Sequence, residues 1–529
     1  MEKSLHDLPT AASSERETSP GILTRLILFT KKLRGLTLSP VTRQVVWSLC
    51  VAGVAVALGV VLSFPAVALD SWAQHKDVLL TQNQAGWFAS VVHLMSIPGS
   101  ILGGVLMDSL GPRRLLLLLL PGLTASWLLI LLTTHNPIML IVVRALQGVL
   151  GAGCVVSVYV YPCEVSEAHR RGVLGALPDT AFSLGFLLTY LLGAVTHWST
   201  LVLLVPPCVF LPCIIAVAFV PESPSWLLQH GKHEEARAVL LLARGPDCDF
   251  ENELLTMKMK ELDNNDYDGP VGCPRFLITQ PRYLLPVLTA ITLIILKECT
   301  GQIVMVLSVV RIFKTAKTGV SPYWCSVLVC CARVVANMTS YPLLVHCQRR
   351  TILSVAAVVA GFSMMLIAYF FYSSTSGSWP NWVPVVSLLL FVGAYGCGVG
   401  PVVCLLATEI MPGAVRGLGS GLSCAVLYIM QFGFIFLATN ADSNLYIYFW
   451  VYASGCFILA GFTSLLPETR NKKLEQLEQF WQDVRLQPPT HTRWCLCRPV
   501  AHQYTLAEDK NNNNNNEHLI GSYKSYVVV

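Results

Sequence analysis

The stretch Tyr161-Pro-Cys-Glu164, followed by Arg171-Gly172, decides the fold because the chain carries its pattern twice. The second copy is Ala407-Thr-Glu409, followed by Arg416-Gly417. In each copy the Glu precedes the Arg by seven residues, and the copies are offset by 245 residues (409 − 164 and 416 − 171). Pro221-Glu-Ser223 and Pro467-Glu-Thr469 repeat at nearly the same offset. Such a repeat predicts two halves of one architecture.

Long apolar runs fill each predicted half. A helix needs about 20 apolar residues to cross the hydrocarbon core of a bilayer, and a polar stretch, Pro221–Tyr283, divides the runs of that length into two sets. The predicted spans are Val45–Leu69, Trp87–Met107, Leu115–Thr133, Ile138–Val160, Gly172–Thr196, Leu201–Val220, Leu284–Phe313, Tyr323–Val345, Thr351–Tyr372, Val383–Thr408, Gly417–Ala438 and Leu445–Leu466.

The composition supports an integral membrane protein. Of the 529 residues, 54% are hydrophobic and 13% are charged, and the mean hydropathy is +0.58. Soluble domains carry about 25% charged residues, so a soluble enzyme, a nucleic-acid-binding protein and a disordered chain are excluded. The net charge of +5 is too small to indicate a polyanionic partner.

These observations predict an all-α membrane protein with two pseudo-symmetric six-helix bundles. The expected parts are a cytoplasmic N-terminal tail (1–44), a first bundle (45–220), a cytoplasmic central loop with short amphipathic helices (221–283), a second bundle (284–466) and a largely disordered C-terminal tail (467–529). Arg and Lys concentrate in alternate loops, as at Arg113-Arg114, Arg170-Arg171 and Arg349-Arg350. Positive loops face the cytoplasm, so both termini are expected there.

Cysteine usage indicates no metal or disulfide framework. Most of the 18 cysteines lie inside apolar runs, where they are typical of small buried residues. No Cys or His spacing in the sequence matches a metal site. No nucleophile–base arrangement or phosphate-binding loop occurs either, so neither enzymatic activity nor a cofactor is expected.

Several motifs resemble the sugar porter branch of the major facilitator superfamily, over nearly all of Val45–Glu468. The matching stretches are Gly103-Gly-Val-Leu-Met-Asp108-Ser-Leu-Gly-Pro-Arg113-Arg114, Arg144-Ala-Leu-Gln-Gly148, Pro221-Glu-Ser-Pro-Ser-Trp226, Gly398-Val-Gly-Pro401 and Pro467-Glu-Thr-Arg470. Within that branch, Leu177-Pro178 and Gln84-Ala-Gly-Trp87 are most similar to arthropod facilitated trehalose transporters. The resemblance implies a plasma-membrane uniporter that moves a sugar by alternating access.

The resemblance also implies a set of gating residues at the cytoplasmic ends of the spans. Ion pairs across the seam between the halves would hold an inner gate shut. The candidates are Asp108, Arg113, Arg114, Glu164, Arg171, Arg349, Arg350, Glu409 and Arg416. The stretch Val345–Arg350 lacks the acidic residue and the glycine that are usual in this family, so the gate is expected to be weaker in the second half.

The expected substrate cavity departs most from the family. Sugar porters hold sugars with amides and an indole. The corresponding positions here, with the remaining candidates for substrate binding, are Asp179, Lys297, Glu298, Gln302, Arg333, Cys404 and Tyr428. A charge near the bilayer centre costs at least about 2.5–3.5 kcal/mol, so the charged members are expected to face a wet cavity and to neutralise one another.

Three functions stay open at this level. The first is a facilitative sugar transporter. The second is an organic-ion or proton-coupled carrier with a charged cavity, and the third is a non-transporting sensor. Span one has no acidic residue before Asp70, which favours uniport. In the C-terminal tail, Cys495 and Cys497 are candidates for lipidation, and Val527-Val-Val529 is a candidate for contact with a scaffold domain.

Overall fold

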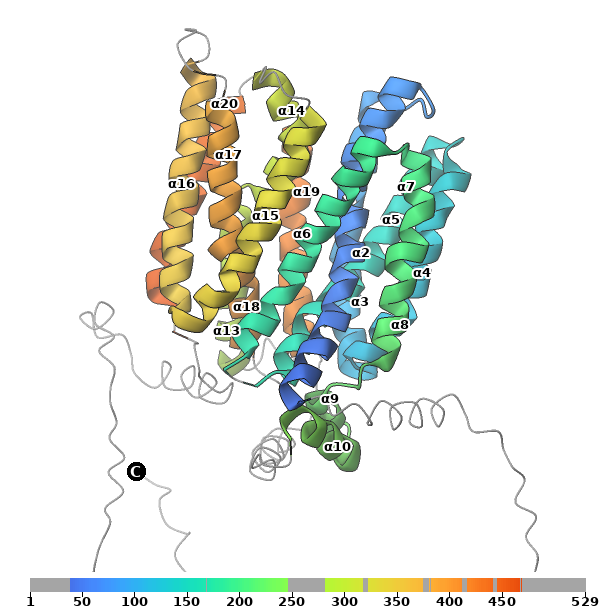
Figure 1. Cartoon of the computed structure of the whole chain (residues 1–529), viewed down its shortest axis with the longest axis vertical. Coiled ribbons are helices and arrows are strands. Elements are labelled where there is room, and N and C mark those ends of the chain that lie inside the picture. Colours follow the sequence, from blue (N-terminus) through green and yellow to red (C-terminus); the bar gives the residue numbers. More distant parts are fainter. Residues whose placement is uncertain are drawn as a thin grey trace, which may run out of the picture. The chain divides into compact units, whose positions relative to one another are not determined.

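The computed structural model describes residues 39–167, 169–245, 281–316, 322–373, 380, 382–411, 416–440, 445–466 and 468. Within these residues, helices form 12 candidate membrane spans, which confirms the predicted fold class (Figure 1). The spans of the first half are α2 (Pro40–His75), α3 (Gln82–Leu110), α4 (Pro112–Thr133), α5 (Pro137–Val165), α6 (Arg171–Val195), and α7 (Trp198–Val205) with α8 (Leu211–Phe219). Those of the second half are α13 (Pro281–Glu298) with α14 (Gln302–Ala316), α15 (Pro322–His346), α16 (Arg349–Ser373), α17 (Val383–Ala394) with α18 (Gly400–Ile410), α19 (Arg416–Asn440) and α20 (Leu445–Phe462).

Capping residues set where several spans begin, and the apolar runs alone do not show them. Helix α2 begins five residues before the predicted Val45, because the Ser39 side chain accepts from the backbone N–H of Thr42 and Pro40 fixes the first turn. Helix α3 begins with a capping box between Thr81 and Gln84.

Each half has its own apolar core. The first is built around aromatic residues such as Phe64, Trp127 and Phe210, and the second around Phe391 and Phe449. Large apolar side chains also cover the outside of the spans, as their exposed fractions show: 75% for Leu132, 61% for Phe362. In water such a surface would be unfavourable, but it suits contact with lipid.

The halves meet along two helix pairs, α3 with α19 and α6 with α15. The first crossing is close because it is lined by glycine: a Cβ added to Gly104 would lie 2.5 Å from the carbonyl oxygen of Gly417 and 3.3 Å from Cα of Gly421. Small residues allow this approach between membrane helices.

Three spans are interrupted. Span seven, predicted as a continuous Leu284–Phe313, breaks after α13, and α14 begins only at Gln302. Gly301 sits at the break with φ of +77°, a conformation that favours glycine. Spans six and ten each contain a π-helical turn, at Pro206–Phe210 and Tyr395–Val399. Interruptions of this kind are frequent at functional sites.

Two short helices, α9 (Pro224–Gln229) and α10 (His233–Arg244), follow the first half at one end of the bundle, which we call the loop end. The opposite end is the far end. The Trp226 indole of α9 donates to the carbonyl oxygen of Asp108 at 2.9 Å. The predicted lipidation of Cys495 and Cys497, the scaffold contact of Val527–Val529, and the tails 1–38 and 469–529 lie outside the described residues.

Candidate functional site

A cavity of about 110 Å³ lies between the two halves. Helices α2, α5 and α6 line it from the first half, and α13, α14, α15, α18 and α19, with the π-helical turn Tyr395–Val399, from the second. Of the seven predicted binding residues, Asp179, Lys297, Gln302, Arg333, Cys404 and Tyr428 line this cavity. Glu298 is buried beside Lys297 but is not among the residues that face the cavity.

The helical geometry of α13 explains this difference. Lys297 and Glu298 are neighbours at the end of α13, and consecutive residues of a helix point about 100° apart. Lys297 Nζ lies 3.4 Å from Cys404 Sγ and 3.8 Å from Glu298 Oε1. The Lys297 ammonium therefore reaches the cavity while the Glu298 carboxylate stays behind it as its counter-ion.

Asp179 enters the cavity from α6, and its backbone is fixed by the second half. The Asn337 amide of α15 donates to the Asp179 carbonyl oxygen at 3.1 Å and to the Ser183 hydroxyl at 2.8 Å. A Cβ on Gly400 would lie 2.6 Å from the Asp179 carboxylate, so a side chain at that position of α18 would have to displace this carboxylate.

Arg333 spans the seam between the halves. Its guanidinium lies 5.3 Å from the centroid of the Phe186 ring in the first half and 5.5 Å from that of Tyr395 in the second. Cation–π contacts stabilise a buried guanidinium and hold its plane in a fixed orientation.

Three residues that line the cavity each have a buried side-chain oxygen without a hydrogen-bond partner among the described residues: Asp179 Oδ2, Ser420 Oγ and Ser423 Oγ. Buried polar groups nearly always bind a partner. The cavity is therefore suited to hold water or a polar solute at these atoms.

Sequence reasoning missed several polar lining residues, namely Tyr159, Tyr395, Ser420, Ser423 and Gln431. The spacing of Tyr428 and Gln431, three residues apart on one helix face, is the signal that was available for the last of these. His93, a residue of span two, lies 3.1 Å from the Gln431 side chain through its Nδ1.

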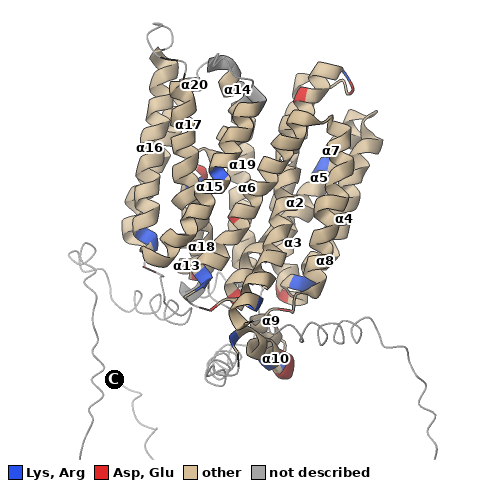
Figure 2. Ribbon diagram, in the orientation of Figure 1, with Lys and Arg blue, Asp and Glu red and all other residues tan. Residues whose placement is uncertain are grey.

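The repeated motifs meet each other at the loop end. Cys163 Sγ and Thr408 Oγ1, which precede the two motif glutamates, lie 3.5 Å apart across the seam. Asp108 of α3 accepts a hydrogen bond from the backbone N–H of Leu418 in α19 at 3.2 Å. Figure 2 shows that the charged residues of the described helices gather mainly at this end.

A buried ion pair joins Arg349 to Glu409, and both residues belong to the second half. The sequence predicts ion pairs that join the two halves, whereas this pair lies within one half. It still lies close to the first half, because a Cβ on Gly172 would be 3.1 Å from the Arg349 guanidinium. Two contacts described above cross the seam at this end. They are the contact between Cys163 and Thr408 and the hydrogen bond from the Leu418 backbone N–H to the Asp108 carboxylate.

A family profile described as "Sugar (and other) transporter" matches residues 43–481. The chain belongs to that family. Its relatives include the facilitated trehalose transporter of Culex quinquefasciatus, 28% identical over 76% of this chain and 78% of the relative. The facilitated trehalose transporter of Aedes aegypti is also 28% identical, over 83% of this chain and 56% of the relative. The chain thus spans little more than half of some curated relatives.

Solved structures of the major facilitator superfamily share the fold of this chain. The proton:xylose symporter XylE bound to 6-bromo-6-deoxy-D-glucose gives a TM-score of 0.72 at 20% identity, covering 83% of this chain and 98% of that one. Inward-open XylE from E. coli gives 0.59 at 19% identity, covering 82% and 99%. The predicted resemblance to sugar porters and to insect trehalose transporters is confirmed.

The Pro-Glu motifs of this family member each cap a helix at the loop end. The Glu222 carboxylate accepts from the backbone N–H of Arg113 at 2.9 Å, at the start of α4. In the second half, the Glu468 carboxylate accepts from the backbone of Arg349 and Arg350 at 3.3 Å, at the start of α16. Burial raises the pKa of Glu222, and the backbone hydrogen bonds oppose that rise.

Several of the remaining predicted gating residues have contacts within their own half. Glu164 accepts from the Ser223 hydroxyl, and Arg171 donates to the Cys163 carbonyl oxygen. The Arg114 guanidinium lies 5.3 Å from the Trp226 ring. Arg113 donates to the Ala218 carbonyl oxygen, and Arg350 donates to the Thr463 and Ser464 carbonyl oxygens. Arg416 lies at the start of α19, and its side chain is outside the described residues.

Proposed function

We propose that this chain is a facilitative sugar transporter of the plasma membrane that works by alternating access. In this proposal the loop end, the central loop and both termini are cytoplasmic, and residues 45–220 and 284–466 are the two halves that rock against each other. The cavity opens to each side in turn, and no covalent chemistry or cofactor takes part.

The observation that carries the proposal is the set of hydrogen-bonding atoms without protein partners in a cavity between two halves. Asp179 Oδ2, Ser420 Oγ and Ser423 Oγ are suited to the hydroxyl groups of a sugar. The amides of Gln302 and Gln431 line the same cavity and bind hydroxyls without the cost of desolvating a charge.

Aromatic rings give the cavity its apolar surface. Tyr159, Tyr395 and Tyr428 line it together with Phe182 and Phe186. A sugar ring has apolar faces that pack on aromatic side chains. The names of the insect relatives, which are facilitated trehalose transporters, favour trehalose or a hexose as the solute.

Uptake of radiolabelled trehalose and glucose into oocytes tests the proposal, with the amount of protein at the cell surface measured in parallel. We expect saturable uptake that Gln302→Ala and Gln431→Ala each reduce. Gln82→Ala is the matched control, because Gln82 is exposed at the start of α3. Absence of uptake by wild-type protein that has reached the surface would contradict a sugar as the solute.

A second candidate function follows from the charges of the cavity. Asp179, Lys297 and Arg333 line it from both halves, and they are suited to a zwitterionic or ionic solute. A screen of amino acids, organic acids and amines in the same oocytes tests this alternative. It predicts uptake that Asp179→Asn abolishes. If sugar uptake is saturable and none of these solutes competes with it, this candidate is excluded.

A further inference from the structure

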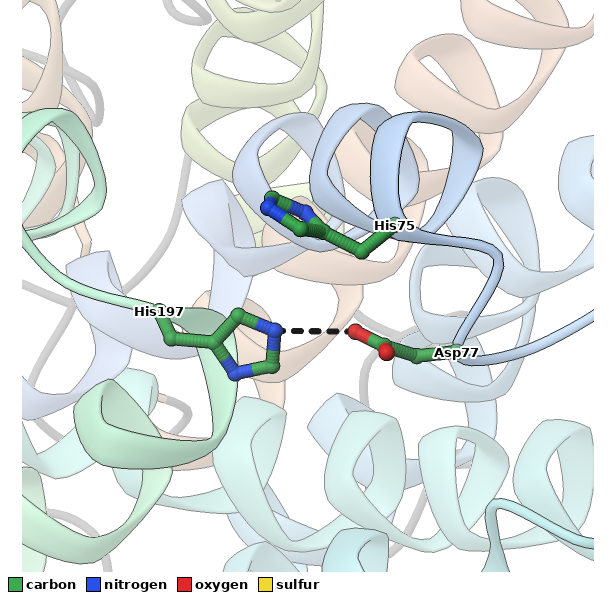
Figure 3. Close-up of side chains that lie close together, drawn as sticks. All are labelled: His75, Asp77 and His197. Carbon is green, nitrogen blue, oxygen red and sulfur yellow. Dashed lines mark hydrogen bonds and ion pairs between the residues drawn. The ribbon is translucent and has the colours of Figure 1, made fainter.

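Two histidines and an aspartate meet at the far end of the first half, away from the cavity. His75 is the last residue of α2, Asp77 follows in the next loop, and His197 directly precedes α7. One potential ligand atom from each lies within 4.8 Å of those of the other two, and all three residues are exposed. Figure 3 shows both imidazoles beside the Asp77 carboxylate.

The hydrogen bonds of the two imidazoles leave nitrogen atoms suited to a metal. His75 Nδ1 lies 3.0 Å from the Ser71 carbonyl oxygen, which only accepts, so this nitrogen carries the proton. Its Nε2 then presents a lone pair. His197 Nε2 lies 2.9 Å from Asp77 Oδ2, while His197 Nδ1 lies 2.9 Å from the Ser199 hydroxyl.

Each of the three groups is oriented by a residue that would not itself touch a metal. Ser71 holds His75, Ser199 holds His197, and the Trp198 indole donates to Asp77 Oδ2 at 2.8 Å. Metal-binding histidines almost always use their second nitrogen in this way, and such outer contacts fix the ring for binding. An ordinary surface His–Asp pair requires neither the nearby second imidazole nor these supports.

We propose that His75, Asp77 and His197 form a binding site for a divalent transition-metal ion, with Zn²⁺ as the expected occupant. Two imidazoles and one carboxylate are typical zinc ligands, and a water molecule would complete the tetrahedron. Ca²⁺ and Mg²⁺ prefer sets of oxygen ligands, which a single carboxylate does not supply.

The spacing of His197 and Asp77 is close to what zinc requires, and the His75 imidazole lies within 4.8 Å of both ligand atoms. Ligands about 2.0–2.2 Å from a tetrahedral ion lie roughly 3.3 Å from one another, and His197 Nε2 is already 2.9 Å from Asp77 Oδ2. The ion would take the place of the proton between these atoms. The Ser199 hydroxyl can then accept from Nδ1 instead of donating to it, because a hydroxyl does both.

A bound ion would tie the end of α2 to the start of α7. Both helices belong to the first half, so the site would stiffen the far end of that half without linking it to the other. This inference does not depend on the proposed transport activity. We therefore expect Zn²⁺ to raise the melting temperature of the purified protein, whatever solute it carries.

Titration of Zn²⁺ into the full-length protein, stripped with a chelator in detergent, tests the site. We expect wild-type protein to bind one more equivalent than His75→Ala, His197→Ala or Asp77→Asn, or to bind it at least tenfold more tightly. Ser199→Ala should weaken binding less. His135→Ala is the matched control, since His135 is exposed between α4 and α5 at the same end.

The melting temperature is the second readout, taken only for variants that elute as a single species in size exclusion. Zn²⁺ should raise it in wild type and His135→Ala but not in the three ligand variants. Other histidines and thiols contribute equally to all variants, so only the difference between them reports on this site. Equal binding and equal thermal shifts across all variants would overturn the proposal.

Discussion

At the scale of single residues, the buried pair of Arg349 and Glu409 makes the clearest prediction for stability. Removal of one partner of a buried ion pair leaves an uncompensated charge and costs about 3–5 kcal/mol. Arg349→Ala should therefore lower the melting temperature in detergent strongly. Arg170→Ala is the control, because Arg170 pairs with Glu167 at the surface, where a pair contributes about 0–1 kcal/mol.

A double variant separates charge from packing in this pair. Arg349→Met with Glu409→Leu removes both charges and keeps apolar volume, so it should be more stable than Arg349→Ala alone. If Arg349→Ala melts at the temperature of Arg170→Ala, the pair does not stabilise the fold.

Arg333→Lys tests whether the cavity needs a guanidinium or only a positive charge. Lys keeps the charge but loses the planar group that lies over the rings of Phe186 and Tyr395. Cation–π contacts contribute about 0.5–2 kcal/mol, so solute affinity should fall by about 2- to 30-fold. The KM of uptake, corrected for surface expression, measures this; an unchanged KM would show that the charge alone matters.

Six of the seven predicted binding residues line the cavity, but the sequence did not predict their surroundings. The resemblance to sugar porters placed Asp179, Lys297 and Arg333 at the cavity, because each lies at a defined position of a span. It did not separate Lys297 from Glu298, because the sequence does not show how the helix is rotated about its axis. The site at His75 was missed because its partner His197 is distant in sequence, and no local spacing shows that two loops meet.

At the scale of helices, the crossing of α3 and α19 depends on the absence of a side chain at Gly417. A Cβ there would lie 1.9 Å from Asp108 Oδ1. We expect Gly417→Ala to displace the Asp108 carboxylate from the Leu418 N–H and to reduce uptake strongly. Gly433→Ala is the matched control on the same helix, since a Cβ at Gly433 meets nothing within 4 Å.

Uptake, surface expression and thiol labelling measure the effect of Gly417→Ala. Cys163 is buried at the loop end near the seam, so faster labelling of this thiol would report opening there. Equal uptake and equal labelling in Gly417→Ala and Gly433→Ala would show that the crossing does not control the gate.

The spans were predictable because the bilayer selects apolar runs of fixed length. Their interruptions were not, since hydropathy measures how apolar a run is and not the path of its backbone. The span around Gly301 is still apolar on average, although it contains Lys297 and Glu298, and the π-helical turn at Tyr395–Val399 also lies inside an apolar stretch. Both irregular elements nevertheless lie where the cavity forms.

At the scale of the whole molecule, the first span favours facilitated transport over proton coupling. From Pro40 to Leu69 it contains no acidic residue. Uptake should therefore be unchanged by a protonophore and should run equally in either direction down a sugar gradient. Counterflow in proteoliposomes at two pH values measures this. Uptake that collapses with the proton gradient would instead indicate coupling.

The repeat predicted two related halves, but it did not predict how they touch. Cys163 and Thr408 occupy equivalent positions of the two copies and meet each other across the seam. The buried pair of Arg349 and Glu409, by contrast, stays within one half. A linear pattern indicates that charges gather at one end of the helices, and only packing decides which of them pair.

The hydrogen bond from the Leu418 backbone N–H to the Asp108 carboxylate bears on the speed of the proposed transport cycle. Leu418 lies in the first turn of α19, so Asp108 caps a helix of the opposite half. An N-cap contributes about 0.5–2 kcal/mol, which biases two states by only about 2- to 30-fold. Water can take over the cap once the halves separate. In the proposed transport cycle, this hydrogen bond by itself therefore adds little to the barrier for opening.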